Sequence, residues 1–160
     1  MQMGKKGTAA VSLTDALDLA IQLCEARGAR LTSMRRSVLE TLLAIERPIT
    51  AYELRPLLES SLQRRVMPVT IYRALDFLVR QHFATRIESR NAYVACAHPE
   101  RAHECVFFVC DRCDTSSEVE NPALETLISR DAEVLGFKVE RQVVELQGVC
   151  ASCRARPVIS

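Results

Sequence analysis

The chain contains 160 residues, of which 48% are hydrophobic and 26% are charged, a composition that is ordinary for a globular protein and excludes wholesale disorder. Its length fits one or two small domains. No apolar run approaches the roughly 18 residues that a membrane span requires, and the N-terminus is a poor secretion signal. We therefore expect a cytoplasmic protein with no membrane partner.

Charge is divided unevenly along the chain. Residues 1–92 carry 14 Lys and Arg against 9 Asp and Glu, whereas residues 93–160 carry 7 against 11. This asymmetry favours two domains, 1–92 and 93–160, and makes a polyanion a candidate partner of the first.

Apolar periodicity and capping signals predict three helices ahead of Pro68. The first spans residues 12–28, the second begins at Thr32, and the third follows a capping box at Thr50. Pro56 is expected to kink the third helix or to shorten its start. The positions expected to be buried are Leu13, Leu17, Ile21 and Cys24 in the first helix, Val38, Leu39, Leu42 and Leu43 in the second, and Leu54, Leu57 and Leu58 in the third.

A fourth helix is predicted from near Thr70 to about Gln81. Ile71, Ala74, Leu75, Leu78 and Val79 form its core face, and Tyr72, Arg73, Asp76 and Arg80 lie on the opposite side. Arginine and tyrosine near a helix N-terminus suit insertion into a DNA major groove, although a solvated helix face is the alternative. Residues 84–88 and 92–96 then predict a two-stranded hairpin, and together these elements predict a winged helix-turn-helix.

Beyond residue 103 the pattern predicts a small α/β unit. It begins with a strand at 106–109, continues with a helix that opens at Asn121 or Pro122 and closes at Gly136, and ends with a strand at 137–146. Leu124, Leu127, Ile128 and Leu135 are the helix positions expected to be buried. A unit this short buries few apolar side chains, so we expect that it needs stabilisation beyond its hydrophobic core. We also expect that it supplies the subunit interface.

Cysteines provide the expected additional stabilisation. Six of the seven lie after residue 95, and two C-x-x-C pairs, Cys110 with Cys113 and Cys150 with Cys153, follow the two predicted strands. Two such pairs predict a four-thiolate structural zinc site. The alternatives are a dithiol redox centre or unrelated thiols, but a redox pair usually opens a helix in a thioredoxin-like pattern, and neither pair is expected to do so.

The fold class predicted from these elements is α+β: an N-terminal winged helix-turn-helix domain followed by a small α/β dimerisation domain with a four-cysteine structural zinc site. No nucleophile motif, phosphate loop or paired-carboxylate signature is present. We therefore expect no enzyme activity and no small-molecule substrate; a thiol oxidoreductase is the remaining enzymatic alternative.

Several motifs resemble the ferric uptake regulator superfamily of metal-responsive repressors. They are Arg30-Leu-Thr, the segment Val69-Thr-Ile-Tyr-Arg-Ala-Leu-Asp-Phe-Leu78, and Cys110-Asp-Arg-Cys113. Asn91-Ala-Tyr-Val-Ala-Cys96 is similar to the branch that controls zinc uptake. The resemblance implies a homodimeric, zinc-activated repressor that binds double-stranded operator DNA. It implies, together with helical phase or charge, DNA contacts by Tyr72, Arg73, Tyr52 and Arg35 or Arg36.

The resemblance also implies a second, regulatory zinc ion in each subunit, held by Cys96, His103 and Glu118. The branch usually has a histidine where this chain has Thr85, so His82 is the preferred fourth ligand, with His98 or water as alternatives. A thiolate at this site favours Zn²⁺ over Fe²⁺ or Mn²⁺ because it is a softer ligand. An iron- or peroxide-sensing regulator of the same superfamily is the nearest alternative function.

Overall fold

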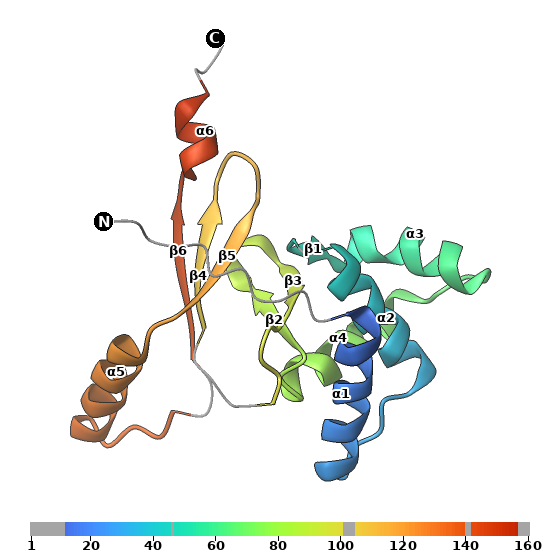
Figure 1. Ribbon diagram of the computed structural model, residues 1–160, viewed down its shortest axis with the longest axis horizontal. Helices are drawn as coiled ribbons and strands as arrows, with labels where there is room; N and C mark the ends of the chain where they lie inside the picture. The colour runs from blue at the N-terminus through green and yellow to red at the C-terminus, as the bar shows by residue number, and fades with distance from the viewer. Residues whose placement is uncertain (1–11, 46, 101–104, 140–141, 157–160) are drawn as a thin grey trace.

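The computed structural model describes residues 12–45, 47–100, 105–139 and 142–156. It contains a helical unit with a three-stranded sheet, followed by a second three-stranded sheet with its own helices (Figure 1). This is the predicted α+β class. Among the described residues, no helix has the length and apolarity needed to cross a bilayer.

The first unit contains the four predicted helices: α1 (Leu13–Ala26), α2 (Ser33–Ile45), α3 (Ala51–Leu62) and α4 (Pro68–Arg80). The Ser12 hydroxyl accepts a hydrogen bond from the Asp15 amide at the start of α1. At α3, Thr50 and Glu53 form a reciprocal capping box. This box holds the start of α3 at Ala51, so the expectation that Pro56 shortens that start was wrong.

The core of the first unit follows the predicted apolar positions, except that Ile21, Leu43 and Val79 are only half-buried and two leucines are exposed. Leu13 is 46% exposed and Leu57 is 44% exposed. Leu13 is the first residue of α1, beyond the part of the helix that packs on the core. In α3 the buried stripe passes through Ala51, Leu54 and Leu58, at spacings of three and four residues, which places Leu57 at its edge.

Helix α4 starts at Pro68, two residues before the predicted start near Thr70. Proline fits the first helical position because its missing N–H would have no partner there in any case. The earlier start adds Val69 to the helix, with consequences for its exposed face.

The first sheet consists of β1 (Ile49–Thr50), β2 (Ala84–Ile87) and β3 (Ala92–Ala95) in the antiparallel order β1-β3-β2. The hairpin of β2 and β3 is the predicted wing, and its turn is a short 3-10 helix, η1 (Glu88–Arg90). Asn91 closes the turn with φ 47°, a conformation that asparagine tolerates better than most residues. The predicted two-stranded hairpin is therefore confirmed. The sequence did not predict β1, which adds a third strand and is too short to show an alternating pattern.

The second unit contains β4 (Cys105–Cys110), β5 (Ser116–Glu120), α5 (Pro122–Val134), β6 (Val143–Gly148) and α6 (Ala151–Ala155). Strand β4 is central, antiparallel to β5 and parallel to β6, and α5 lies in the connection between β5 and β6. Asn121 caps α5 as predicted, by accepting a hydrogen bond from the Leu124 amide. Gly136 follows the helix with φ 65°.

Three expectations about the second unit were wrong. Strand β5 was not predicted, because its sequence is mostly polar. The last strand starts at Val143 rather than at Phe137, which is 69% exposed. Leu127 and Leu135 of the α5 region are also exposed, at 50% and 80%. Their apolar face has no cover within the described part of this single chain.

A small apolar cluster joins the two units. Ile87 of the wing is fully buried with Phe107 and Val109 of β4, and Val94 and Val143 pack against them. The wing therefore packs against one face of the second sheet.

Candidate metal centres and nucleic-acid interface

The four predicted zinc ligands meet at one end of the second sheet. The Sγ atoms of Cys110, Cys113, Cys150 and Cys153 all lie within 4.8 Å of one another. Cys113 Sγ and Cys150 Sγ are 3.8 Å apart, and a tetrahedron with metal–sulfur bonds of about 2.3 Å has edges of about 3.8 Å. Because β4 and β6 are parallel neighbours, the two C-x-x-C pairs at their C-terminal ends lie at the same end of the sheet. The donor set and its spacing fit a zinc ion.

Hydrogen bonds from backbone amides lower the pKa of one of these thiols. The amides of Cys150 and Arg112 donate hydrogen bonds to Cys110 Sγ at 3.4 and 3.5 Å, and these bonds lower the pKa of the Cys110 thiol to about 6. In contrast, hydrogen bonding with the Cys113 and Cys150 sulfurs raises the pKa of Cys153 to about 12. Four thiols this close do not all ionise readily without a cation, which favours a metal site over a free dithiol.

The expectation that neither C-x-x-C pair opens a helix was wrong for the second pair. Cys150 is the N-cap of α6, where its sulfur accepts a hydrogen bond from the Cys153 amide at 3.4 Å. The helix has only five residues, however, and both of its thiols lie next to the other pair. The convergence of four sulfurs separates this site from a two-thiol redox centre.

The residues expected to bind a regulatory metal come from the junction of the two units. Glu118 lies opposite Phe107 in the antiparallel pair of β4 and β5, and directly opposite residues point to the same face of a sheet. Phe107 packs against the wing, so Glu118 also lies on the wing-facing side. Glu120, two residues on, shares this face, and its Oε1 atom is 3.8 Å from His98 Nε2.

Cys96 and His82 lie at the base of the wing. Cys96 is 8% exposed, and its amide donates a hydrogen bond to the carbonyl of Phe83, the residue after His82. His82 is exposed, with φ 60°. His103, the remaining expected ligand, lies outside the described residues. Sequence reasoning did not single out Glu120, whose polar side chain in a polar edge strand gave no signal.

The exposed face of α4 matches the prediction. Tyr72 is 44% exposed, and Arg73, Asp76 and Arg80 are also exposed. Val69, 52% exposed, lies one turn before Tyr72 and Arg73 on the same face. Sequence reasoning missed it because the predicted helix began after it.

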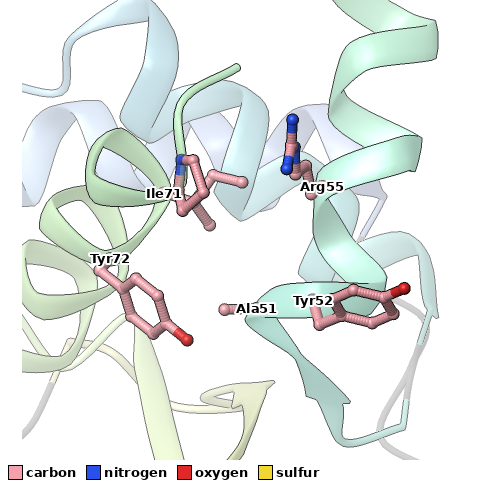
Figure 2. Close-up of a pocket in the computed structure, with 6 residues that line it drawn as sticks. Ala51, Tyr52, Arg55, Ile71 and Tyr72 are labelled. Carbon is pink, nitrogen blue, oxygen red and sulfur yellow. The ribbon is translucent and has the colours of Figure 1, made fainter. Parts of the chain in front are cut away.

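Tyr52 lies across a small hollow from Tyr72. The hollow, of about 100 Å³, is lined by Ala51, Tyr52, Arg55, Pro68, Ile71 and Tyr72. Figure 2 shows Tyr72 extending from α4 toward Ala51, whereas the ring of Tyr52 is directed away from Tyr72. Tyr52 is 88% exposed, the most exposed large apolar side chain of the described residues.

The two arginines of α2 have different surroundings. Arg35 lies over the Phe77 ring, with its guanidinium carbon 3.6 Å from the ring centroid, and donates a hydrogen bond to the carbonyl of Arg30. Arg36 pairs with Glu40 one turn later in its own helix. Among the described residues, Arg36 forms an ion pair with Glu40, whereas Arg35 is part of the packing between α2 and α4.

Comparisons with known proteins agree with this architecture. The sequence model of the ferric uptake regulator family matches residues 26–147. The chain is 36% identical over 135 residues to the zinc uptake regulation protein of Escherichia coli (strain K12), covering 84% of this chain and 78% of that protein. A zinc uptake regulator complexed with zinc and DNA has a TM-score of 0.83 at 35% identity, covering 89% of this chain and 95% of that one.

The structures of XcZur add a comparison between two states. The holo structure has a TM-score of 0.77 at 36% identity and covers 91% of this chain and 100% of that one. The apo structure, at the same 36% identity, has a TM-score of 0.51 and covers 89% and 98%. The match along most of the sequence, the winged-helix and α/β architecture and the four-cysteine cluster lead to one conclusion: this chain belongs to the ferric uptake regulator family.

Proposed function

We propose that the protein is a zinc-responsive transcriptional repressor that acts in the cytoplasm, binds double-stranded operator DNA as a homodimer and controls genes of zinc uptake. Each subunit holds two zinc ions, one structural and one regulatory. The regulatory ion fixes the angle between the wing-bearing unit and the dimerisation unit, so that two recognition helices fit successive major grooves.

The arrangement of the two units carries this proposal. The chain resembles a zinc- and DNA-bound regulator with a TM-score of 0.83 and the apo form of another with only 0.51, although the identities are 35% and 36%. Sequence similarity therefore does not explain the difference, which comes from the arrangement of the polypeptide. The structure is close to the arrangement that a relative adopts on DNA.

The donor set supports zinc as the sensed metal. A buried thiol, Cys96, follows the wing. Glu118 lies on the wing-facing side of the second sheet, and His98 lies 3.8 Å from Glu120 of the same strand. Thiolate is a soft ligand that suits Zn²⁺ better than Fe²⁺ or Mn²⁺. We retain Cys96, His103 and Glu118 as regulatory ligands, with His82 as the fourth and His98 or water as alternatives.

The exposed stripe of α4 supports DNA binding. Tyr72 and Arg73 are placed to reach base edges or phosphates, and Val69, at the N-terminal end of the stripe, is placed to contact a thymine methyl group. Tyr52 and Arg36 are proposed as flanking phosphate contacts. Arg35, which is stacked on Phe77, is proposed to contribute chiefly by fixing α4 against α2.

Uncovered apolar surface on the second unit supports the homodimer. Phe108, Val119 and Leu146 are 49%, 42% and 45% exposed. The strand registers place all three on the sheet face opposite the wing. This face, and the exposed apolar residues around α5, would both be available to a second copy.

Selection of DNA from a random duplex pool tests the function. Zinc-loaded protein should enrich a common, two-fold symmetric sequence, hereafter the selected duplex. Protein treated with a mild chelator, which removes only the exchangeable ion, should enrich nothing. Enrichment of the same sequence with and without the exchangeable ion would refute a zinc-responsive repressor, and enrichment of nothing in either state would refute DNA recognition.

A further inference from the structure

Glu145 of β6 caps the tip of the wing. Its two carboxylate oxygens accept hydrogen bonds from the backbone amides of Glu88 and Ser89, at 2.6 and 3.1 Å. Burial opposes ionisation of this carboxyl group, but the hydrogen bonds from Ser89 and Glu88 outweigh it, so its pKa is lowered. The carboxylate is therefore charged at neutral pH and binds two wing amides that β2 and β3 do not use.

Arg90 makes a second connection from the same wing turn. One of its terminal nitrogens lies 2.7 Å from an oxygen of Asp111, and its Nε atom lies 3.5 Å from an oxygen of Asp114. Asp111 stands between Cys110 and Cys113, and its amide donates a hydrogen bond to the carbonyl of Gly148 in β6. The arginine thus joins the wing to the turn that carries half of the four-cysteine site.

These polar contacts surround the apolar cluster of Ile87, Phe107 and Val109. Their location differs from that of the regulatory residues, because Cys96 and His82 lie at the base of the wing and Glu145 and Arg90 meet at its tip. With the proposed regulatory ion at the base of the wing, the two units would be connected at both ends of the hairpin.

We infer that Glu145 and Arg90 are positioning residues that hold the wing against the four-cysteine turn and so favour the DNA-binding arrangement of the two units. This inference rests on the proposed function. We call the contacts of Glu145 and Arg90 with residues 88, 89, 111 and 114 the wing latch. The regulatory zinc ion and the wing latch stabilise the same arrangement, so loss of the wing latch raises the free zinc concentration needed for DNA binding.

For the acidic residues of the wing latch, net charge alone predicts a change in DNA affinity of the opposite sign. Replacing Glu145 or Asp111 by alanine makes the protein more positive and, from charge alone, should strengthen binding to a polyanion. Loss of the wing latch should weaken binding instead. The sign of the change therefore separates positioning from charge, and from a role of Arg90 as a direct phosphate contact.

The experiment compares full-length Glu145→Ala and Asp111→Ala with the wild type. Affinity for the selected duplex is measured across buffered free zinc, after tight-zinc content and dimerisation are shown to be unchanged. Glu25→Ala is the charge-matched control, because Glu25 is an exposed residue of α1 outside the wing latch. The free zinc needed for half-maximal binding should rise about fivefold or more in Glu145→Ala and about two- to fivefold in Asp111→Ala. It should not rise in Glu25→Ala.

Hydrogen exchange gives a readout that does not depend on DNA. The Glu88 and Ser89 amides should be protected in the zinc-loaded wild type and should exchange faster in Glu145→Ala. The Leu124 amide, which donates to a side chain outside the wing latch, should not change. If these amides are unprotected in the wild type, or if both variants bind DNA as well as the wild type at the same free zinc, the inference is wrong. If the wild type binds no DNA but Glu145 protects the amides, the proposed function fails while the contact itself stands.

Discussion

Among the arginines of α2, α3 and α4, we propose Arg73 as the one best placed to contact a base. Arg36 and Arg55 pair with acidic residues one turn away in their own helices, whereas Arg73 forms no ion pair with any residue that the structure describes. It is exposed near the N-terminal end of α4, the part of a recognition helix that usually meets base edges. An unpaired guanidinium at this position is free to form a bidentate contact with guanine or to neutralise a phosphate.

Replacing Arg73 by alanine should weaken binding to the selected duplex by about 1–3 kcal/mol if the side chain reads a base, and discrimination at one position should be lost. If it contacts only phosphate, affinity should fall evenly across sequences, and the slope of log affinity against log salt should decrease by about one. Fluorescence anisotropy at several salt concentrations measures both quantities. Arg130→Ala, on exposed α5, is the matched control; equal affinities for Arg73→Ala and the wild type would exclude both roles.

His82 is exposed and has a left-handed backbone conformation just after α4, a conformation that helix ends also adopt without any role in metal binding. If it binds the regulatory ion, His82→Ala should need more free zinc for DNA binding, while its tight zinc remains. Titration with a fluorescent zinc chelator measures the two classes of ion separately. An unaltered zinc response in this variant would transfer the fourth position to His98 or to water.

Residue-level prediction from sequence succeeded where chemistry or helical phase fixed the answer. The four cysteines converge as their spacing required, and Tyr72 and Arg73 are exposed as their phase required. Prediction failed where tertiary contacts determine the surroundings of a residue. Nothing in the sequence around Arg35 indicates that it stacks on Phe77, and Val69 was missed because a helix boundary was placed two residues late.

At the scale of elements, we expect the second unit to depend on a structural zinc ion at its four-cysteine cluster. Few of its described residues are buried apart from the strand residues Val106, Phe107 and Val109. A structural zinc site can contribute about 10–16 kcal/mol of apparent binding free energy, which is coupled to folding. The ends of β4 and β6 and the start of α6 are all connected through the four thiols.

Cys113→Ser should therefore lose the tight zinc ion and the dimer together. Zinc content after extensive dialysis and molar mass by light scattering provide the measurements. Cys24→Ser, which alters a buried cysteine of α1 far from the cluster in sequence, is the comparison variant and should keep both the ion and the dimer. A stable, zinc-free dimer of Cys113→Ser would show that the cluster does not hold the unit together.

The sequence predicted long elements better than short ones. Helices α1 to α4 have apolar periodicity, α1 and α3 have side-chain caps, and α4 starts at a proline, so their existence followed from local rules. Strands β1 and β5 form because other strands offer them hydrogen bonds, and their own residues give no period-2 apolar signal. Helix α6 starts at a cysteine whose sulfur replaces the usual oxygen of a capping residue.

At the scale of the whole molecule, we propose that the arrangement of the two units controls DNA binding. We propose a boundary after residue 92, although β3 continues the first sheet to Ala95. The segment after this strand carries Cys96 and His98 directly into the junction. The sequence showed the length of this segment and its candidate ligands. It did not show the contact of the wing with the second sheet, because that contact depends on the packing of Ile87 against Phe107.

A regulatory ion at this junction can shift the arrangement only by its difference in affinity for the two arrangements. A coupling free energy of about 1–3 kcal/mol corresponds to a roughly 5–150-fold change in DNA affinity, and operator DNA must tighten zinc binding by the same factor. Measurement of zinc affinity with and without the selected duplex should give this equality. If the duplex left the zinc affinity unchanged, zinc and DNA would not act through one shared equilibrium.

The most direct test of zinc-controlled DNA binding is the affinity for the selected duplex across buffered free zinc, with Fe²⁺ and Mn²⁺ as control metals, for the wild type and Cys96→Ser. The wild type should bind in a zinc-dependent manner and respond more weakly to the other two metals. Cys96→Ser should keep its tight zinc and its dimer but lose the response. If Cys96→Ser binds DNA over the same free-zinc range as the wild type, the regulatory site is misplaced and the zinc-specific function is contradicted.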